Sequence, residues 1–318
     1  MYKSFFNLAR NPFDLTPDPA FLFSTRQHNE ALATLYYGVR HHKGFVVVTG
    51  EVGTGKTLLL RCLLRQLKQS EDVACAYVFN SVLTPMEFLQ YVLADFGLQA
   101  SGKTKSELLL DLSHFLTSRG SKKLTTMLVV DEAHHLSEEV LEEVRLLTNL
   151  ETAEEKLLQV VLVGQPELDE KLKLPCLRQL RQRIALHARL DKLSEKEARG
   201  YIEGRLQTAK AGEDSDEVFS EQAISAIYRW SGGVPRVINA ICENALITAY
   251  ARQIRNITSA VIDEVAHELE LDLNLPEPDD NYPFDVTDIR PDVRCMQALY
   301  STSKAEIVEL DLIPSEQQ

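Results

Sequence analysis

The sequence lacks the long apolar runs, paired cysteines and basic excess that mark several common classes of protein. No stretch approaches the roughly 20 apolar residues of a membrane-spanning helix, and the N-terminus has no continuous apolar segment of the signal-peptide kind. The five cysteines are scattered, with no C-x-x-C pair, which predicts free thiols rather than a disulfide framework or a zinc site. These absences predict a cytoplasmic protein without a transmembrane segment.

Basic residues are in the minority. The chain has 47 acidic and 34 basic residues, with a formal net charge of −13, whereas bulk affinity for nucleic acid comes from basic surface. The acid is concentrated after Pro276, where ten acidic residues accompany three basic ones. Charge therefore disfavours general DNA binding, although a local basic patch remains possible on the rest of the chain.

The most informative segment is a glycine-rich stretch that matches the pattern G-x-x-x-x-G-K-[ST]. An apolar run typical of a buried strand precedes it, and a leucine-rich run at helical spacing follows. In this context the backbone N–H groups face phosphates, Lys56 reaches the β- and γ-phosphates, and the Thr57 hydroxyl holds Mg²⁺. The residues expected to bind a nucleoside triphosphate are Gly50, Glu51, Val52, Gly53, Thr54, Gly55, Lys56, Thr57 and Leu58.

The apolar runs predict an α/β fold with a five-stranded parallel sheet, followed by an all-helical lid. Strands are expected at residues 44–49, 73–81, 126–130, 157–163 and 184–190. Helices such as 86–96 and 138–150 separate most of them. After Leu193 the strand signals cease, and four helices are expected at about 194–210, 220–232, 235–253 and 258–271.

These patterns divide the chain into four segments. We expect an N-terminal segment packed on the nucleotide site at 1–43, the α/β core at 44–192, the helical lid at 193–272 and an acidic, poorly ordered tail at 273–318. Within the tail, residues 307–313 could add a strand edge.

An acidic pair and an amide follow two of the expected strands. Asp131 and Glu132 end one apolar run, and Gln165 follows the next. Because the carboxyl ends of parallel strands meet where the phosphate loop lies, we expect Asp131 to support Mg²⁺ and Glu132 to polarise the attacking water. Gln165 either senses the γ-phosphate and positions that water, or caps a turn.

Four arginines are candidates for contacts to the γ-phosphate. Arg178, Arg181 and Arg183 precede the last expected strand, from which ring-forming ATPases extend an arginine finger to the neighbouring subunit. A solvated basic helix face is the alternative. We favour Arg183, which directly precedes the strand, then Arg181, and Arg178 third. Arg236 begins the third lid helix and either contacts the γ-phosphate or is an ordinary helix-start residue.

Together these features resemble the AAA+ ATPases, and within them the general secretion pathway protein A (ExeA-like) family and its relatives near transposition regulators. The resemblance covers residues 1 to about 272. Its separated motifs, in chain order, are Phe5-Phe6-Asn7-Leu8, Pro12-Phe13-Asp14-Leu15-Thr16-Pro17-Asp18-Pro19, Phe21-Leu22-Phe23, His28-Asn29-Glu30-Ala31-Leu32, the phosphate loop, Gly164-Gln165-Pro166-Glu167-Leu168 and Gly233-Val234-Pro235-Arg236.

The resemblance implies ATP as the nucleotide, with adenine held near the N-terminal Pro/Phe segment. It makes Asp131 and Glu132 the Walker B pair, Gln165 sensor 1 and Arg236 sensor 2. It also implies a homo-oligomer, a ring or filament that forms on ATP binding, because the finger acts only across a subunit interface. The partner expected is a protein of an envelope or export system.

Two features depart from the family. Full-length secretion members continue into a membrane span and a peptidoglycan-binding domain, and neither is expected here, as in shorter soluble members. In addition, His134 follows the Walker B pair where the family more often has Gln, which leaves the signal relay beyond Glu132 open.

The same residues also allow other function classes. Asp-Glu-Ala-His also marks a helicase superfamily, but those enzymes need a second RecA-like domain, and here only helices follow the sheet. A third class is a nucleotide-dependent switch that hydrolyses ATP slowly. It is disfavoured because every expected catalytic position carries a suitable residue. The main alternative to a protein-directed ATPase is a DNA-bound AAA+ regulator of the transposition target-selection type. Its candidate bases are Lys103, Lys105, Arg119, Lys122, Lys123, Arg252 and Arg255.

Overall fold

One parallel sheet organises the first part of the chain. The computed structural model describes residues 1–272 except for 68–71, 80–82, 153–154 and 212–216. Within this part, five strands lie in the order β2-β3-β4-β1-β5, and all the pairings are parallel. The strands are β1 (Phe45–Gly50), β2 (Val73–Val78), β3 (Thr125–Val130), β4 (Gln159–Gly164) and β5 (Ile184–Leu190).

The predicted fold class is confirmed, because each expected strand overlaps an observed one and the sheet is parallel. The agreement reflects burial: β1, β3 and β4 are buried along their whole length, which requires the continuous apolar runs that the sequence shows. Residues 80–81 of the expected second strand, the expected strand edge at 307–313 and the acidic tail all lie outside the described residues.

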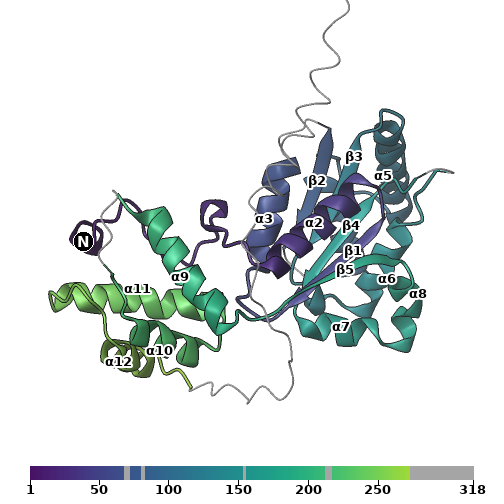
Figure 1. Cartoon of the computed structure of the whole chain (residues 1–318). Helices are drawn as coiled ribbons and strands as arrows, with labels where there is room; N and C mark the ends of the chain where they lie inside the picture. The colour runs from purple at the N-terminus through teal and green to yellow at the C-terminus, as the bar shows by residue number, and fades with distance from the viewer. Residues whose placement is uncertain (68–71, 80–82, 153–154, 212–216, 273–318) are drawn as a thin grey trace, which may run out of the picture. The chain divides into compact units, whose positions relative to one another are not determined.

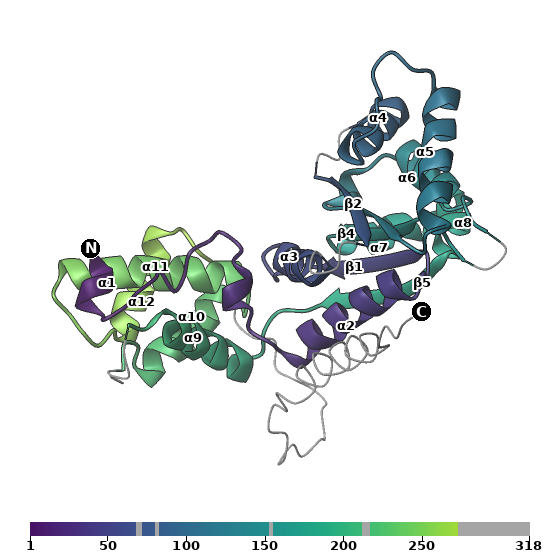
Figure 2. The ribbon, with the colours of Figure 1, turned by 90° about the horizontal axis from the view of Figure 1, so that it is seen from above.

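Alternate residues of the central strands serve two different hydrophobic layers. Val46 and Val48 pack with helices α2 (Arg26–Arg40) and α3 (Lys56–Leu67) on one face of the sheet. Phe45 and Val47 face the opposite layer, and Figures 1 and 2 show helices on both faces. That second layer contains α4 (Pro85–Asp95), α5 (Lys105–Gly120), α6 (Glu138–Leu147), α7 (Pro166–Leu172) and α8 (Arg178–Arg181).

A separate hydrophobic cluster holds the helices that follow β5. Ser194 and Ser220 cap two of these helices with their hydroxyls, and Gly232 ends the second in the left-handed conformation. The four helices are α9 (Glu195–Ala209), α10 (Glu221–Ser231), α11 (Pro235–Ala251) and α12 (Ser259–Glu268).

The N-terminal residues are shared between the two cores. The short helix α1 (Tyr2–Phe5), together with Phe6, Phe13 and Phe21 of the following segment, joins the cluster of α9 to α12. In contrast, α2 joins the sheet. Three 3-10 turns complete the description: η1 (Pro19–Phe21), η2 (Ala133–His135) and η3 (Pro175–Leu177).

Candidate nucleotide-binding site

Three strand ends meet at one edge of the sheet. The glycine loop follows β1, Asp131 and Glu132 follow β3, and Gln165 follows β4. Since β4 lies between β1 and β3, these segments are neighbours although up to 115 residues separate them in sequence. The carboxyl edge of a parallel sheet, where these residues lie, is the usual place for a ligand in this kind of fold.

The loop has the backbone that its glycines predict. Gly53 and Gly55 have φ values of 81° and 102°, in the region that favours glycine. Thr54 is fully buried, and its hydroxyl donates to the carbonyl of Glu51 at 2.8 Å, which fixes the turn. The loop therefore leads directly into α3, whose N-terminus adds partial positive charge for a phosphate.

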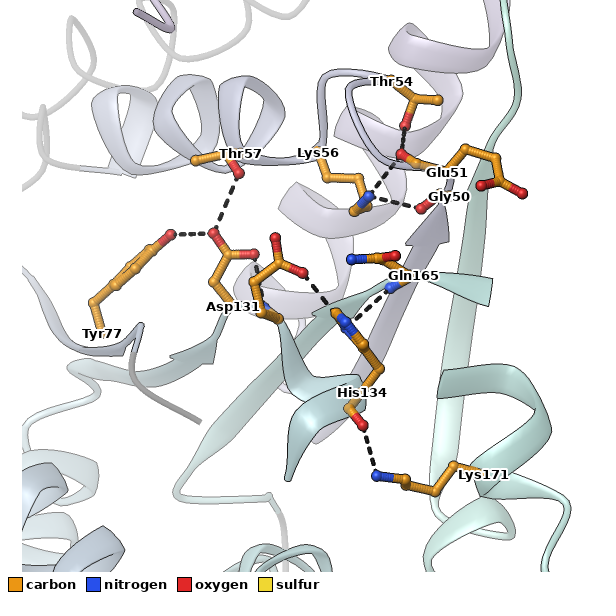
Figure 3. A network of polar contacts seen from close by, with 11 residues as sticks. Gly50, Glu51, Thr54, Lys56, Thr57, Tyr77, Asp131, His134, Gln165 and Lys171 are labelled. Atoms are coloured by element: carbon orange, nitrogen blue, oxygen red, sulfur yellow. Dashed lines mark hydrogen bonds and ion pairs between the residues drawn. The ribbon is translucent and has the colours of Figure 1, made fainter. Parts of the chain in front are cut away.

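Lys56 holds its ammonium group inside the loop. Its Nζ donates to the carbonyls of Gly50 at 2.6 Å and Glu51 at 2.8 Å (Figure 3). An ammonium has three donors, so one N–H remains for a phosphate oxygen. Burial lowers the pKa of Lys56, against the carboxylates of Glu132 and Asp131, which raise it. An anionic phosphate would reinforce the charged form.

Asp131 lies where a phosphate-bound cation would need it. The Thr57 hydroxyl donates to its Oδ2 at 3.3 Å, and the Tyr77 hydroxyl donates to the same oxygen at 2.7 Å. Burial and the Asp131 carboxylate raise the pKa of Tyr77, which keeps the phenol a donor. Among the described residues, no three His, Cys, Asp or Glu side chains form a metal site alone. This donor set fits Mg²⁺ shared with a nucleotide, because Mg²⁺ prefers few carboxylates, phosphates and water.

Glu132 and Gln165 meet through His134. Glu132 is a non-glycine residue in the left-handed region, with φ 51°, a conformation that needs support from its surroundings. Its Oε2 lies 3.4 Å from His134 Nδ1, and the backbone N–H of Gln165 donates to that same nitrogen at 3.4 Å. The sequence left the role of His134 open, and in the structure His134 lies between the segments that follow β3 and β4.

The lid helix α11 contacts the loop directly through Arg236, its second residue. The Arg236 backbone N–H donates to the Gly53 carbonyl at 3.2 Å, and a Cβ built on Gly53 would lie 2.7 Å from Arg236 Cβ. Together with residues 14–18, the loop and Arg236 line a cavity of about 330 Å³, within the range of ligand sites. The lid residues Tyr201, Arg205 and Asn239 also line it.

Sequence reasoning missed His28, which braces the loop from the N-terminal segment. Its Nε2 lies 3.2 Å from the Thr54 carbonyl, and its Nδ1 lies 2.7 Å from the Thr25 hydroxyl. Burial lowers the pKa of His28, so the neutral ring donates from Nε2 to Thr54 and accepts from Thr25 at Nδ1. In the sequence, His28 opens one of the family motifs and Thr25, three residues earlier, is an N-cap, but neither signal predicts the contact with Thr54.

The three finger candidates have different environments. Arg183 donates from Nη1 to the Arg145 carbonyl at 3.0 Å and to the Thr148 hydroxyl at 2.9 Å, at the end of α6. Arg178 and Arg181 are exposed on α8, and neither guanidinium makes a hydrogen bond or ion pair within the described residues. Arg183 is therefore held by contacts within this chain, whereas the guanidinium groups of Arg178 and Arg181 are accessible.

Most of the basic residues named for DNA contact are engaged elsewhere. Lys103, Lys105 and Arg252 form ion pairs with Asp111, Glu143 and Glu264 respectively. Arg119 donates to the backbone carbonyls of residues 72 and 125, and Arg255 lies over the ring of Phe5. These contacts reduce the basic surface on which the DNA-bound alternative depends.

Comparisons with known proteins identify the family. Residues 39–172 match the family model described as an AAA domain. Over 271 residues the chain is 45% identical to general secretion pathway protein A of Aeromonas hydrophila. The chain is an ExeA-like AAA protein. The match covers 85% of this chain and 48% of the relative, so the chain spans about half the length of that relative.

Solved AAA structures share the fold of this ExeA-like chain. The Aeropyrum pernix ORC2 protein in ADPNP-ADP complexes has a TM-score of 0.61 at 19% identity and covers 82% of this chain and 74% of its own. Drosophila ORC bound to DNA has a TM-score of 0.61 at 22% identity, covering 82% and 65%. The Thermotoga maritima RuvB branch migration motor has a TM-score of 0.52 at 15% identity, covering 79% and 71%.

No helix in the described part of the chain is both long and apolar enough to cross a membrane.

Proposed function

We propose that this ExeA-like protein binds Mg·ATP and hydrolyses it between the subunits of a homo-oligomer, and that the cycle assembles or remodels a protein partner of a bacterial envelope secretion or export system. The observation that carries the proposal is that Lys56, Thr57 and Glu132 line one cavity together with Arg236. The Thr57 hydroxyl also donates to Asp131. The choice of partner rests on the relative named general secretion pathway protein A. The need for ATP implies the cytoplasmic setting that the sequence predicts.

Each residue of the site has a separate role in the proposed reaction. Lys56 and the loop bind the phosphates, and Thr57 and Asp131 would hold Mg²⁺. The bound ion would supply positive charge that offsets the charge on the transferred phosphoryl group. Glu132 lies beside them and accepts a proton from the attacking water. Gln165 follows β4 at the same edge and takes the sensor 1 position; Arg236 senses the nucleotide from the lid.

The finger is best assigned to Arg181, with Arg178 second. A finger acts in trans, so its guanidinium must be free to reach another subunit. Arg183 donates to the end of α6 in its own subunit, and we propose that it fixes the segment that presents Arg181. This order differs from the preference that sequence position alone suggested.

The first test is the ATPase rate per subunit, measured across a range of protein concentrations with and without double-stranded DNA. A rate that rises with concentration and ignores DNA supports an assembling, protein-directed enzyme. Strong stimulation by DNA that weakens as salt rises would instead support the DNA-bound regulator, because phosphate contacts are salt-dependent. No hydrolysis at any concentration would refute the enzymatic part of the proposal.

Replacing the base provides a second test. Glu132→Gln should keep ATP binding, lose hydrolysis and stabilise the ATP-bound oligomer, because the amide cannot accept the proton of water but preserves the shape of the site. Size-exclusion chromatography with ATP, alongside the ATPase rate, measures both effects. A variant that hydrolyses ATP at the wild-type rate would remove Glu132 from the mechanism.

A further inference from the structure

The Nδ1 atom of His134 takes part in two contacts that exclude each other. The Gln165 backbone N–H donates to it at 3.4 Å, and the Oε2 atom of Glu132 lies 3.4 Å from it (Figure 3). A ring nitrogen either accepts through its lone pair or donates through its proton, and never does both at once. His134 can therefore hydrogen-bond with the Gln165 turn or with Glu132, but not with both.

The surroundings favour the bond to Gln165. The His134 side chain is 7% exposed, and burial, followed by the neighbouring His135, lowers the pKa of His134 against the carboxylates of Glu132 and Glu167. A neutral ring with its proton on Nε2 accepts from Gln165. In agreement with this, Glu132 Oε2 is a buried atom with no hydrogen-bond partner among the described residues.

The backbone of His134 is fixed to the same helix that follows Gln165. Lys171, on α7, donates from Nζ to the carbonyls of His134 at 2.6 Å and Leu136 at 2.8 Å. Helix α7 begins directly after Gln165. The turn after the Walker B pair is therefore held to α7 at two points, one through a side chain of α7 and one through the imidazole of His134.

We propose that His134 is a positioning residue that makes the availability of the catalytic base depend on the place of the Gln165 turn. While the Gln165 N–H occupies Nδ1, Glu132 stays unpaired and free to accept a proton from water. When the turn moves away, the ring proton transfers through solvent from Nε2 to Nδ1. The Nδ1–H group then donates to the Glu132 carboxylate, which is no longer free to accept a proton from water. The charge of the ring is unchanged by this shift. The inference rests on the proposed hydrolysis of ATP, since it gives His134 a role only in that step.

Three substitutions at this position separate the role of Nδ1 from that of the ring. His134→Phe keeps the ring shape and removes both contacts. His134→Asn keeps a polar atom at the place of Nδ1, and His134→Gln moves the polar atoms one bond further, toward the place of Nε2. His135→Phe is the matched control, because His135 stacks on His134 with ring centroids 3.9 Å apart and is exposed.

The variants should differ in the rate of ATP hydrolysis but not in ATP binding. For His134→Phe and His134→Gln, kcat should fall on the order of tenfold, because the Gln165 turn, which carries the proposed sensor, loses the hydrogen bond to Nδ1 that holds it at the site. For His134→Asn and the His135 control, it should stay within about threefold of wild type. The Kd for a non-hydrolysable ATP analogue and the melting temperature should be unchanged in all of these proteins.

Several outcomes would overturn the inference. If all three variants at position 134 hydrolyse ATP at the wild-type rate, or if Asn falls as far as Gln, the polar atom at the Nδ1 place has no role. If the Phe variant does not fold, the comparison between Asn and Gln decides alone. A wild-type protein without ATPase activity would refute the proposed function itself, and this result is distinct from failure of the variants against an active wild type.

Discussion

Gly53 provides the sharpest test of the contact between the phosphate loop and the lid helix. An alanine at this position meets two separate penalties. Its φ of 81° lies in the region that L residues rarely adopt, at a cost of about 1–2 kcal/mol. In addition, the new Cβ would lie 2.7 Å from Arg236 Cβ and 3.1 Å from Val234 Cγ1. Because Arg236 Cβ is next to the helix backbone, it cannot swing away, and the start of α11 must shift.

Gly102 is the matched control for the first penalty alone. Its φ of 77° is nearly the same, but a Cβ there would have no heavy atom within 4 Å. Both Gly→Ala variants should therefore lose about 1–2 kcal/mol from backbone strain, or a few degrees in melting temperature. Only Gly53→Ala should also move the first turn of α11 and disturb the phosphate site.

The assay is the Kd for ADP, measured by fluorescence titration, together with thermal unfolding. We expect Gly53→Ala to weaken ADP binding by at least roughly tenfold, the equivalent of about 1.4 kcal/mol, while Gly102→Ala binds as the wild type does. If the two variants bind ADP equally well and unfold at the same temperature, the lid helix does not rest on Gly53 in solution, and the structural account of Arg236 as a sensor is wrong.

Three further predictions concern single side chains. Arg183→Ala should lower the free energy of unfolding by about 1–3 kcal/mol through the lost bonds to α6, whereas Arg181→Ala should melt as the wild type does but lose roughly 10³-fold or more in ATPase rate. Mixing the Arg181→Ala and Glu132→Gln proteins should restore activity that neither has alone, and no recovery would argue against a finger in trans. Tyr77→Phe should raise several-fold the Mg²⁺ concentration for half-maximal hydrolysis, about what one hydrogen bond to the Walker B aspartate contributes, and an unchanged Mg²⁺ requirement would contradict that role. Burial lowers the pKa of His28 in the folded protein, so the unfolded chain binds the proton first as pH falls below about 6.5, and folding stability falls with it. Chemical denaturation at pH 7.5 and 5.5 should therefore show that His28→Gln loses less stability at the lower pH than the wild type does.

The sequence predicted the sheet and the phosphate loop well because both are local signals. A strand buried on both faces has to be largely apolar, as β1, β3 and β4 are. The glycine pattern likewise specifies a backbone, and the φ values of Gly53 and Gly55 agree with it. The position of Asp131 at the end of β3 follows from the same local reading.

The contacts that tune the site are long-range, and spacing carries no information about them. Tyr77 reaches Asp131 because β2 lies beside β3, which the chain order alone does not reveal. The place of Arg183 depends on its rotamer and on the exposed carbonyl at the end of α6. Sequence position favoured it as the finger, whereas its hydrogen bonds identify a fixed structural contact. His28 stands in a family motif, but the motif does not reveal that its ring contacts the Thr54 carbonyl.

The N-terminal segment connects the two cores by hydrogen bonds as well as by packing. Arg205 of α9 is buried without an acidic partner in the described part of the chain, and its Nε donates to the Pro12 carbonyl at 2.6 Å. Five residues later, the Pro17 carbonyl accepts from Arg61 of α3, the helix that begins at the phosphate loop, also at 2.6 Å. A buried charge keeps its hydrogen bonds because losing them is costly. Moving α9 away from α3 must therefore stretch the chain between residues 12 and 17 or break one of these bonds. The lid is thus tied to the phosphate loop and its helix twice, once through the contact of α11 with Gly53 and once through this segment.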